Sequence, residues 1–362
     1  MKTILLTVLV FGVIINLHEL GHFFFARLFG VRVNEFSFGM GPKLLGWGKG
    51  ETSYSIRLFP IGGFVAMEGE DEESRDGRAF CNKPAWQRFL ILFAGAGMNL
   101  LLGLCLLGYT TSQMDLLGTN IVGRVEEGAV SASYLQPGDR IVAVNGYNTP
   151  GYSDVVFQLI RDQDGVVDLT ILRGGDHLSM NRWERALAGL GIGEKSLGER
   201  LTMTVPFAME DVGDGLRAIR IDFVFLGAER TLGNAVYYTC QQTVSTVKQV
   251  WYSLLDIVTG RFGLSQLSGP VGTASVIREA SDAGLRSLLI LVSYISINVG
   301  VFNLLPIPAL DGGRMFFLLA GALLRRPIPP RYEAYINAAG MLILLIFVGV
   351  VTFSDVMKLV AK

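Results

Sequence analysis

The sequence predicts a polytopic α-helical membrane protein with four transmembrane helices, a membrane-associated β-hairpin or small sheet, and one β-rich domain outside the membrane. Of its 362 residues, 50% are hydrophobic and only 17% are charged, which is too apolar for an ordinary soluble enzyme. The net charge of −1 offers little attraction for nucleic acid, so we expect the lipid bilayer as a partner and no nucleic acid. Four segments are apolar and long enough to cross a hydrocarbon core of about 30 Å: residues 3–28, 86–109, 285–305 and 333–357.

The basic residues predict which side of the membrane each connection faces. They gather after the first span and before the last, and connections rich in Lys and Arg stay in the cytoplasm. Both termini and the long region 110–284 are then expected outside. The first span lacks a small-residue cleavage site, so we interpret it as retained and not as a signal peptide. The residues that set this orientation are Arg27, Arg32, Lys43, Lys49, Arg57, Arg75, Arg78, Lys83 and Arg88 after the first span, and Arg325, Arg326 and Arg331 before the last.

Four parts follow along the chain. Residues 1–110 hold the first two spans, with a strand-like segment at 30–68 whose alternating apolar residues and glycines predict a β-hairpin dipping toward the membrane. Residues 111–228 form the β-rich domain, residues 229–284 an amphipathic helical linker, and residues 285–362 the last two spans.

Within the β-rich domain the sequence alternates short strands with turns. No assignment is made for residues 178–200, and His177 is expected on the surface. In the linker, apolar residues at helical spacing predict a helix over 234–260. The predicted strands of the domain are 121–125, 166–172, 201–207 and 217–226, with a helix near 153–161.

Inside the first span the sequence reads His18-Glu19-Leu20-Gly21-His22, an HExxH motif. On a helix the two histidines fall on one face and can bind one zinc ion, while Glu19 is placed to act as general base on a water molecule. Ionisable residues in an apolar span are costly to keep without partners, which favours a metal site over chance.

The third ligand has few candidates. Among the three histidines of the chain only His177 is left, in a distant polar region. Asp311 is the sole carboxylate between Asp282 and Glu333, and it follows Pro306 and Pro308, which break the third span and are expected to hold the backbone extended at membrane depth. We therefore predict an open His18–His22–Asp311 zinc site, with one catalytic Zn²⁺. Asn303, just before the break, is a candidate donor of a hydrogen bond to the substrate.

These motifs together resemble the site-2 protease family of intramembrane zinc metalloproteases, most closely its bacterial RseP/RasP type. The resemblance is carried by HExxH in the first span, NxxPxPxLDGG from Asn303 to Gly313, and the run Pro-Gly-Asp-Arg-Ile-Val-Ala-Val-Asn-Gly at 137–146. It implies zinc ligands His18, His22 and Asp311, the catalytic base Glu19, and a PDZ-like fold for residues 121–225. One departure is Ala96 in the second span, where the resemblance leads us to expect proline.

The resemblance also implies a function and a location. We expect regulated intramembrane proteolysis in a bacterial cell membrane, with the active site toward the cytoplasm and the PDZ-like domain outside. The expected substrates are single-pass membrane proteins, such as anti-sigma factors already shortened by another protease, or remnant signal peptides. Since the chain has room for one PDZ domain, filtering by a tandem pair is not implied.

Three other functions stay open at this point. A membrane-anchored HExxH protease could digest loops or soluble domains, but it would take a third ligand from a downstream glutamate. A non-catalytic PDZ scaffold would not need Glu19. A zinc transporter would need several polar residues along a pore, and these spans offer few.

Overall fold

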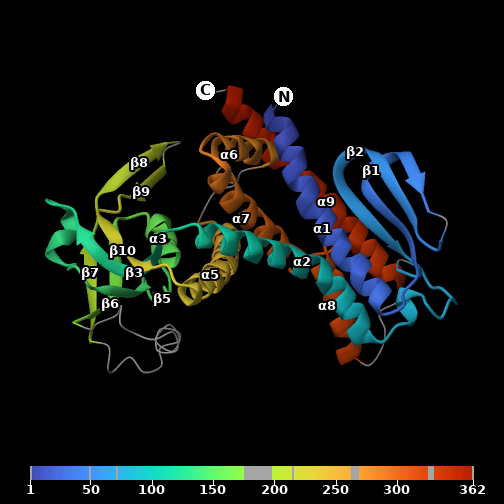
Figure 1. Cartoon of the computed structure of the whole chain (residues 1–362), viewed down its shortest axis with the longest axis horizontal. Coiled ribbons are helices and arrows are strands. Elements are labelled where there is room, and N and C mark those ends of the chain that lie inside the picture. Colours follow the sequence, from blue (N-terminus) through green and yellow to red (C-terminus); the bar gives the residue numbers. More distant parts are fainter. Residues whose placement is uncertain are drawn as a thin grey trace. The chain divides into compact units, whose positions relative to one another are not determined.

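The computed structural model describes residues 2–48, 50–70, 72–174, 198–213, 216–261, 269–324 and 330–360. The chain divides into two compact units, residues 1–106 with 253–362 and residues 107–252. Figure 1 labels the elements of both. The expected four-part division concerns topology across a membrane, and it stays a prediction.

The first unit is built on the apolar helices. Four helices are long and apolar enough to cross a membrane, and their ranges match the four predicted spans within a few residues. The prediction of a four-helix membrane protein with β structure is thereby confirmed at this level. The four helices are α1 (Lys2–Leu28), α2 (Ala85–Ser112), α7 (Leu285–Asn303) and α9 (Pro330–Val360).

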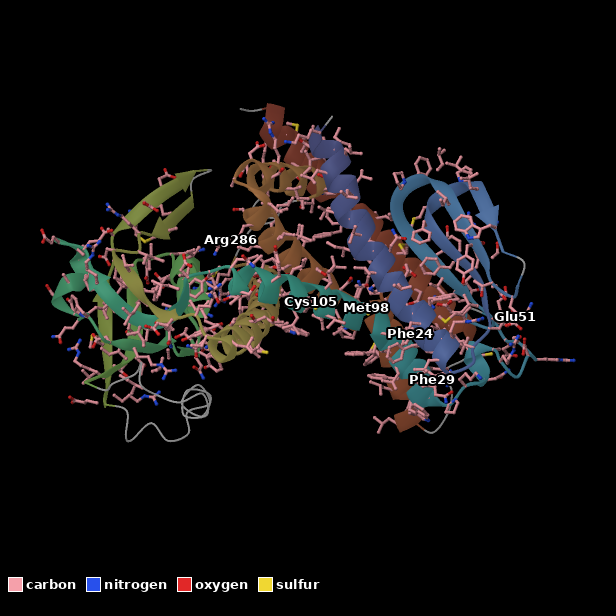
Figure 2. All side chains as sticks on the ribbon, in the orientation of Figure 1. Phe24, Phe29, Glu51, Met98, Cys105 and Arg286 are labelled. Carbon is pink, nitrogen blue, oxygen red and sulfur yellow. The ribbon has the colours of Figure 1, made fainter. Side chains whose placement is uncertain are left out.

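The ends of α1 and α2 are held together by aromatic residues. Phe24 and Phe29 lie at the same end of α1, and Met98 and Cys105 lie along α2 (Figure 2). The ring of Phe29 meets that of Trp86 edge-on, with 5.3 Å between centroids. Such edge-to-face pairs add stability beyond the area they bury. The contact joins the residue after the end of α1 to the first turn of α2.

The predicted hairpin between α1 and α2 is confirmed, and it is larger than a simple one. β1 (Val33–Trp47) and β2 (Ser53–Met67) pair so that Val33 faces Met67 at the root and Trp47 faces Tyr54 at the turn. Phe36 is paired with both Val65 and Tyr54, so the two long strands bend into a wider sheet beside α1 (Figure 1). Its root packs in one apolar core with residues of α1, α2 and α8, among them Ala26, Ile91 and Met315.

Two helices of this unit were not predicted. α6 (Pro270–Asp282) packs Ile277 against Val10 and Ile14 of α1. α8 (Asp311–Leu323) starts after the expected end of the third span at residue 305. Both are short and follow a break at proline or glycine, so their apolar pattern is only three to four turns long and was hard to separate from its neighbours.

The backbone between α7 and α8 differs from the expected extended form. The amide of Ile307 donates to the carbonyl of Leu305 at 2.7 Å, and that of Leu310 to Ile307 at 3.2 Å. Ala309 has a positive φ of 75°, a left-handed conformation that a non-glycine residue seldom adopts. Pro306 and Pro308 lack the N–H groups that a helix needs, but the remaining amides close turns and do not leave the chain extended.

The second unit holds a six-stranded sheet of order β10–β3–β4–β6–β7, with β5 paired to β4. α3 (Tyr152–Arg161) packs on it around a core that includes Val122, Ile141 and Leu159. Asn145 and Gly146 both have positive φ, as a tight turn between β4 and β5 requires. The strands of the sheet are β3 (Leu116–Val125), β4 (Arg140–Val144), β5 (Tyr147–Asn148), β6 (Val166–Arg173), β7 (Glu199–Pro206) and β10 (Phe223–Glu229).

The expected single strand at 217–226 is wrong. The chain there forms β9 (Leu216–Ile219), which pairs with β8 (Met209–Gly213), and then β10 of the main sheet. Asp222 lies at the break, buried, and accepts hydrogen bonds from the amide and the hydroxyl of Ser131, the latter at 2.6 Å. A buried aspartate tied to another element ends one strand and redirects the chain.

Two further expectations bear on this unit. The predicted helix at 234–260 is confirmed as α5 (Leu232–Val258). His177 and most of 178–200 lie outside the described residues.

Candidate metal centre

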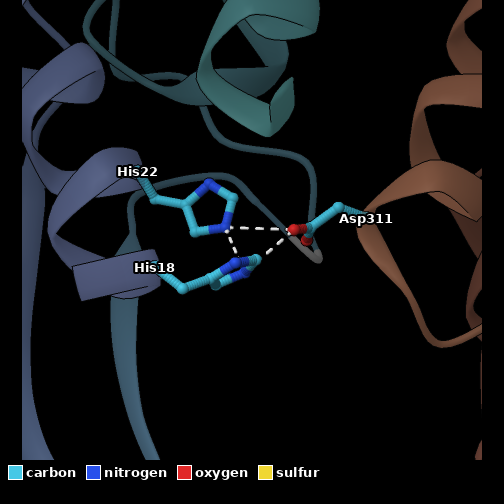
Figure 3. Close-up of side chains that lie close together, drawn as sticks. All are labelled: His18, His22 and Asp311. Atoms are coloured by element: carbon cyan, nitrogen blue, oxygen red, sulfur yellow. Dashed lines mark hydrogen bonds and ion pairs between the residues drawn. The ribbon is translucent and has the colours of Figure 1, made fainter. Parts of the chain in front are cut away.

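The structure brings together the three side chains that the sequence proposed as ligands. The Oδ2 atom of Asp311 lies 3.0 Å from the Nε2 atom of His18 and 3.2 Å from that of His22. The two Nε2 atoms are 3.1 Å apart. Figure 3 shows the two rings of α1 and the carboxylate of α8 converging on one point.

This cluster fits a zinc ion. In a tetrahedral site with bonds of about 2.0–2.1 Å, neighbouring ligand atoms are about 3.3 Å apart, which is close to the three observed separations. Nitrogen lone pairs and a carboxylate facing one point repel one another unless a cation lies between them. Both histidines are more than nine-tenths buried, so bulk water does not relieve this repulsion. The donor set, two imidazoles and one carboxylate, is one that catalytic zinc uses with a fourth position left for water.

Helix α1 places the histidines and α2 orients one of them. The spacing of four residues puts His18 and His22 on one face of α1. The Nδ1 atom of His22 lies 2.8 Å from the carbonyl of Ile91, which can only accept a hydrogen bond. The ring hydrogen of neutral His22 is thus on Nδ1, and the Nε2 lone pair faces Asp311 and His18.

Two glycines let α1 and α2 pack closely and still leave space for the histidine rings. A Cβ atom at Gly95 would lie 2.3 Å from His22 Nε2 and 2.8 Å from His18 Cε1. One at Gly21 would lie 2.4 Å from the carbonyl of Ala94. Non-bonded heavy atoms do not approach one another so closely. Both positions therefore need glycine for the two helices to meet at the site.

Asp311 is aimed at the site by the turn that precedes α8. It lies in the first turn of that helix, where a carboxylate is favoured by the helix dipole. The amide of Ala309 donates a hydrogen bond of 3.2 Å to the side-chain oxygen of Asn337 on α9. This bond supports the strained turn. A Cβ atom at Gly312 would lie 2.1 Å from the carbonyl of Leu305, so the helix folds back tightly on the turn.

Glu19 lies between the two histidines on α1 and next to the sheet. A Cβ atom at Gly63 of β2 would come within 3.5 Å of the Glu19 Cγ atom and 3.1 Å of Asn16 Oδ1. The backbone of β2 therefore passes directly beside the carboxylate that the sequence nominated as the base. Glu19 is not one of the three converging side chains.

Within the described residues, no hydrogen bond links Asn303 to the cluster of His18, His22 and Asp311. Its Nδ2 atom donates to the carbonyl of Val299, one turn back in α7, at 3.0 Å. An amide nitrogen carries two hydrogens, and this bond uses one of them.

Sequence reasoning predicted for Asn99 on α2 only a hydrogen-bonded link between helices, whereas its amide lies against His18. It missed three other groups near the site, which are Ile91 and Gly95 on α2 and Asn337 on α9. The two asparagines stand out as amides in apolar spans, which is a signal of a buried polar partner. A main-chain carbonyl and a glycine leave no such signal.

Comparison with known proteins agrees with the site. Residues 6–347 match Peptidase family M50. A protein of Clostridium acetobutylicum named as a zinc metalloprotease is 34% identical over 357 residues, covering 98% of this chain and 97% of its own length. The regulator of sigma-W protease RasP of Bacillus subtilis is 26% identical over 445 aligned positions, covering 99% of both chains.

The zinc metalloprotease RasP of Shouchella clausii is 28% identical over 442 positions, covering 99% of this chain and all of its own. The match to the family spans nearly the whole chain and includes both parts of the cluster. The protein therefore belongs to peptidase family M50, the site-2 protease family, and is a zinc-dependent metalloendopeptidase.

Proposed function

We propose that this protein cuts transmembrane segments of single-pass membrane proteins, with His18, His22 and Asp311 as the zinc ligands and Glu19 as the catalytic base. The observation that carries the proposal is the position of the cluster. His18 and His22 lie in the apolar helix α1, and Asp311 begins α8, after the turn that follows the apolar helix α7. A site built from membrane helices favours a membrane-embedded peptide bond over a soluble domain as substrate.

The chain's own residues divide the work at the site. Zinc, when bound, supplies a Lewis acid that polarises a carbonyl and makes a water molecule nucleophilic near neutral pH. Glu19 takes a proton from water and passes it to the leaving amine. Asn303 uses its second amide hydrogen to hold the substrate backbone. The turn around Pro306 and Pro308 gives water a polar place at membrane depth.

The sheet beside α1 supports the capture of an unwound segment. A peptide bond in a helix is shielded by its hydrogen bonds, so the substrate must become extended before attack, and addition to a strand edge would hold it extended. A pocket of about 410 Å³ lies between α1 and the sheet, lined largely by apolar residues such as Leu17, Leu20 and Phe38. It suits the apolar side chains of a transmembrane substrate.

Exposed apolar side chains on the sheet support its contact with the bilayer. Contiguous exposed apolar residues on one element mark a membrane or partner surface. Those on the sheet are Phe38, Met40, Leu44, Leu45, Trp47, Ile56, Leu58 and Phe59.

The topology and the substrate class belong to the same proposal. The basic residues after α1 favour a bacterial cell membrane protein with its site toward the cytoplasm, and with residues 110–284 and both termini outside. One relative is named as a regulator of sigma-W protease, so a membrane-anchored anti-sigma factor, first shortened by another protease, is the substrate class we expect here.

We also propose a PDZ-like role for the β-rich domain of residues 111–228. Its antiparallel sheet with one packed helix and the turn at Asn145-Gly146 support this. A peptide would add to an edge strand of the sheet. If so, a peptide matching the shortened end of a substrate should slow hydrogen exchange in β10 or β7, whereas uniform exchange would argue against it.

The test of the main proposal pairs zinc content with mapped cleavage. Purified protein and its Glu19→Gln variant would be given a single-span substrate in vesicles, and products would be mapped by mass spectrometry. Glu19→Gln should keep zinc and lose about 10²–10⁴-fold in cleavage rate. Full cleavage by the variant, or cuts confined to loops outside the membrane segment, would overturn the proposal.

A further inference from the structure

Helix α2 runs past both histidines with three residues one turn apart, Ile91, Gly95 and Asn99. The carbonyl of Ile91 lies 2.8 Å from His22 Nδ1. Gly95 leaves the space that both rings fill. The side-chain amide of Asn99 lies 3.3 Å from His18 Nδ1, and Asn99 has no exposed surface.

The chemistry of a neutral imidazole links these contacts. A neutral ring carries one hydrogen, so a histidine that offers the Nε2 lone pair to a metal carries its hydrogen on Nδ1. That N–H group is buried among apolar helices and needs an acceptor, because an unpaired buried donor costs about 1–3 kcal/mol. For His22 the acceptor is the Ile91 carbonyl. For His18 the neighbouring group is the amide of Asn99.

We propose that Asn99 is the positioning residue of His18, with its amide oxygen accepting the Nδ1 hydrogen and so holding the Nε2 lone pair toward the zinc. This inference rests on the proposed role of His18 as a ligand. Oxygen and nitrogen of an amide exchange places by a half-turn about Cβ–Cγ, and which is which follows from the hydrogen bonds each orientation permits. With oxygen toward His18, Asn99 does for this ring what Ile91 does for His22.

No other bond opposes that orientation. The Oδ1 atom of Asn99 has no hydrogen-bond partner among the described residues, so turning the amide breaks no acceptor bond. With the nitrogen toward His18, the amide would donate to Nδ1 and leave the ring hydrogen on Nε2, 3.0 Å from Asp311 Oδ2. That tautomer cannot give its Nε2 lone pair to a metal, so the first orientation is the one zinc requires.

The link between helices does not use this side chain. The hydroxyl of Ser296 on α7 donates to the main-chain carbonyl of Asn99 at 2.8 Å. A side-chain substitution at 99 leaves that bond in place. If Asn99 only links the helices, replacing its side chain should leave zinc affinity unchanged. If Asn99 positions His18, the same replacement should weaken zinc binding.

The experiment compares zinc affinity in full-length variants in detergent, by competition with a chromophoric chelator. Asn99→Leu removes the acceptor and should weaken zinc binding about 10–100-fold, the usual cost of losing a partner of a ligand histidine. Asn99→Asp keeps an acceptor and no donor, and it should bind zinc within about threefold of wild type. Ser296→Ala is the matched control that removes a contact of the same residue away from the ring, and its zinc affinity should not change.

Two results would overturn the inference. One is a folded Asn99→Leu variant with wild-type zinc affinity. The other is a folded Asn99→Asp variant that has lost zinc, because the side chain would then act as a donor or through packing. The comparison of Asn99→Asp with wild type remains decisive even if the leucine variant does not fold. His18→Ala serves as a separate arm: if it binds zinc as wild type does, the proposed ligand set fails, whatever Asn99 does.

Discussion

The Nε2 atom of His18 lies 3.0 Å from the Oδ2 atom of Asp311, although one belongs to the first helix of the chain and the other to α8 near its end. The two residues meet because α1 and α8 pack in one unit with α2 and the root of the sheet. No local segment can form the site alone. Zinc binding should therefore report on the assembled fold of this unit.

Replacing Asp311 tests the third ligand. Asp311→Ala leaves two histidines, and we expect zinc affinity to fall by at least about 100-fold, since ligand loss exceeds the loss of a supporting contact. Zinc content of the purified protein measures this. Asp282→Asn is a suitable control because that aspartate is exposed at the end of α6 and pairs with the exposed Arg278. Undiminished zinc in Asp311→Ala would remove this residue from the site.

Gly95→Ala tests the space that the two rings occupy. The added methyl group would lie 2.3 Å from His22 Nε2, so the ring or the helix must move, and we expect zinc affinity to drop about tenfold or more. Gly97→Ala is the matched control two residues on. Its methyl group would meet only Phe93, at 3.4 Å, an ordinary contact. Equal zinc affinity in the two variants would show that α2 does not confine the rings.

The sequence predicted that these three side chains come together because their chemistry is visible in residue types. Two histidines four apart in an apolar span, and one lone carboxylate at a proline break, have few structural uses, and the structure brings these three together. The four spans and the hairpin were predictable for a similar reason, since length and alternation are local properties. The order of strands in residues 107–252 was not, because a buried polar residue such as Asp222 redirects the chain through contacts far away in sequence.

The surroundings of the ligands were harder to foresee. Ile91 acts through its carbonyl and Gly95 through the absence of a side chain, and neither property distinguishes them from other residues of an apolar helix. Asn99 was visible as a polar residue, but its sequence position gives only a helix-linking role. It takes the pairing of α1 with α2 to show that its amide lies against His18.

Acid should loosen the sheet beside α1 through Glu35. Burial opposes ionisation of this carboxyl, but hydrogen bonds from Ser55 and Arg57 outweigh it and hold the pKa of Glu35 below its ordinary value of 4.5. A group whose pKa is lower in the folded state contributes stability above its unfolded pKa and loses it as pH falls through the folded pKa. Hydrogen exchange of β1 and β2 amides should therefore speed up below pH 4.5 more in wild type than in Glu35→Gln, which lacks the titrating group. Identical acid profiles for the two proteins would contradict this role.

The pairing of Arg314 with Glu70 predicts that the sheet and the Asp311 helix are coupled. Arg314 lies one turn after Asp311 in α8, and its guanidinium donates to the carboxylate of Glu70, which follows β2. Both side chains are partly buried, with 27% of Arg314 and 18% of Glu70 exposed, so removing one charge leaves the other incompletely solvated. We expect Glu70→Gln to destabilise the first unit by about 1–3 kcal/mol and to weaken zinc binding severalfold, since Asp311 loses part of its support.

The control for this pair is an exposed ion pair of the same unit. Arg78 and Glu51 form an ion pair of 2.8 Å, but each side chain is about half exposed. Glu51→Gln should change the stability of the fold little, because solvent screens exposed ion pairs, and it should leave zinc affinity unchanged. Thermal unfolding and chelator competition would be measured on both variants, and on Arg314→Gln and the double variant Glu70→Gln/Arg314→Gln to isolate the coupling. If Glu70→Gln and Glu51→Gln behave alike, the partly buried pair does not hold Asp311 in place, and the turn before α8 must do so unaided.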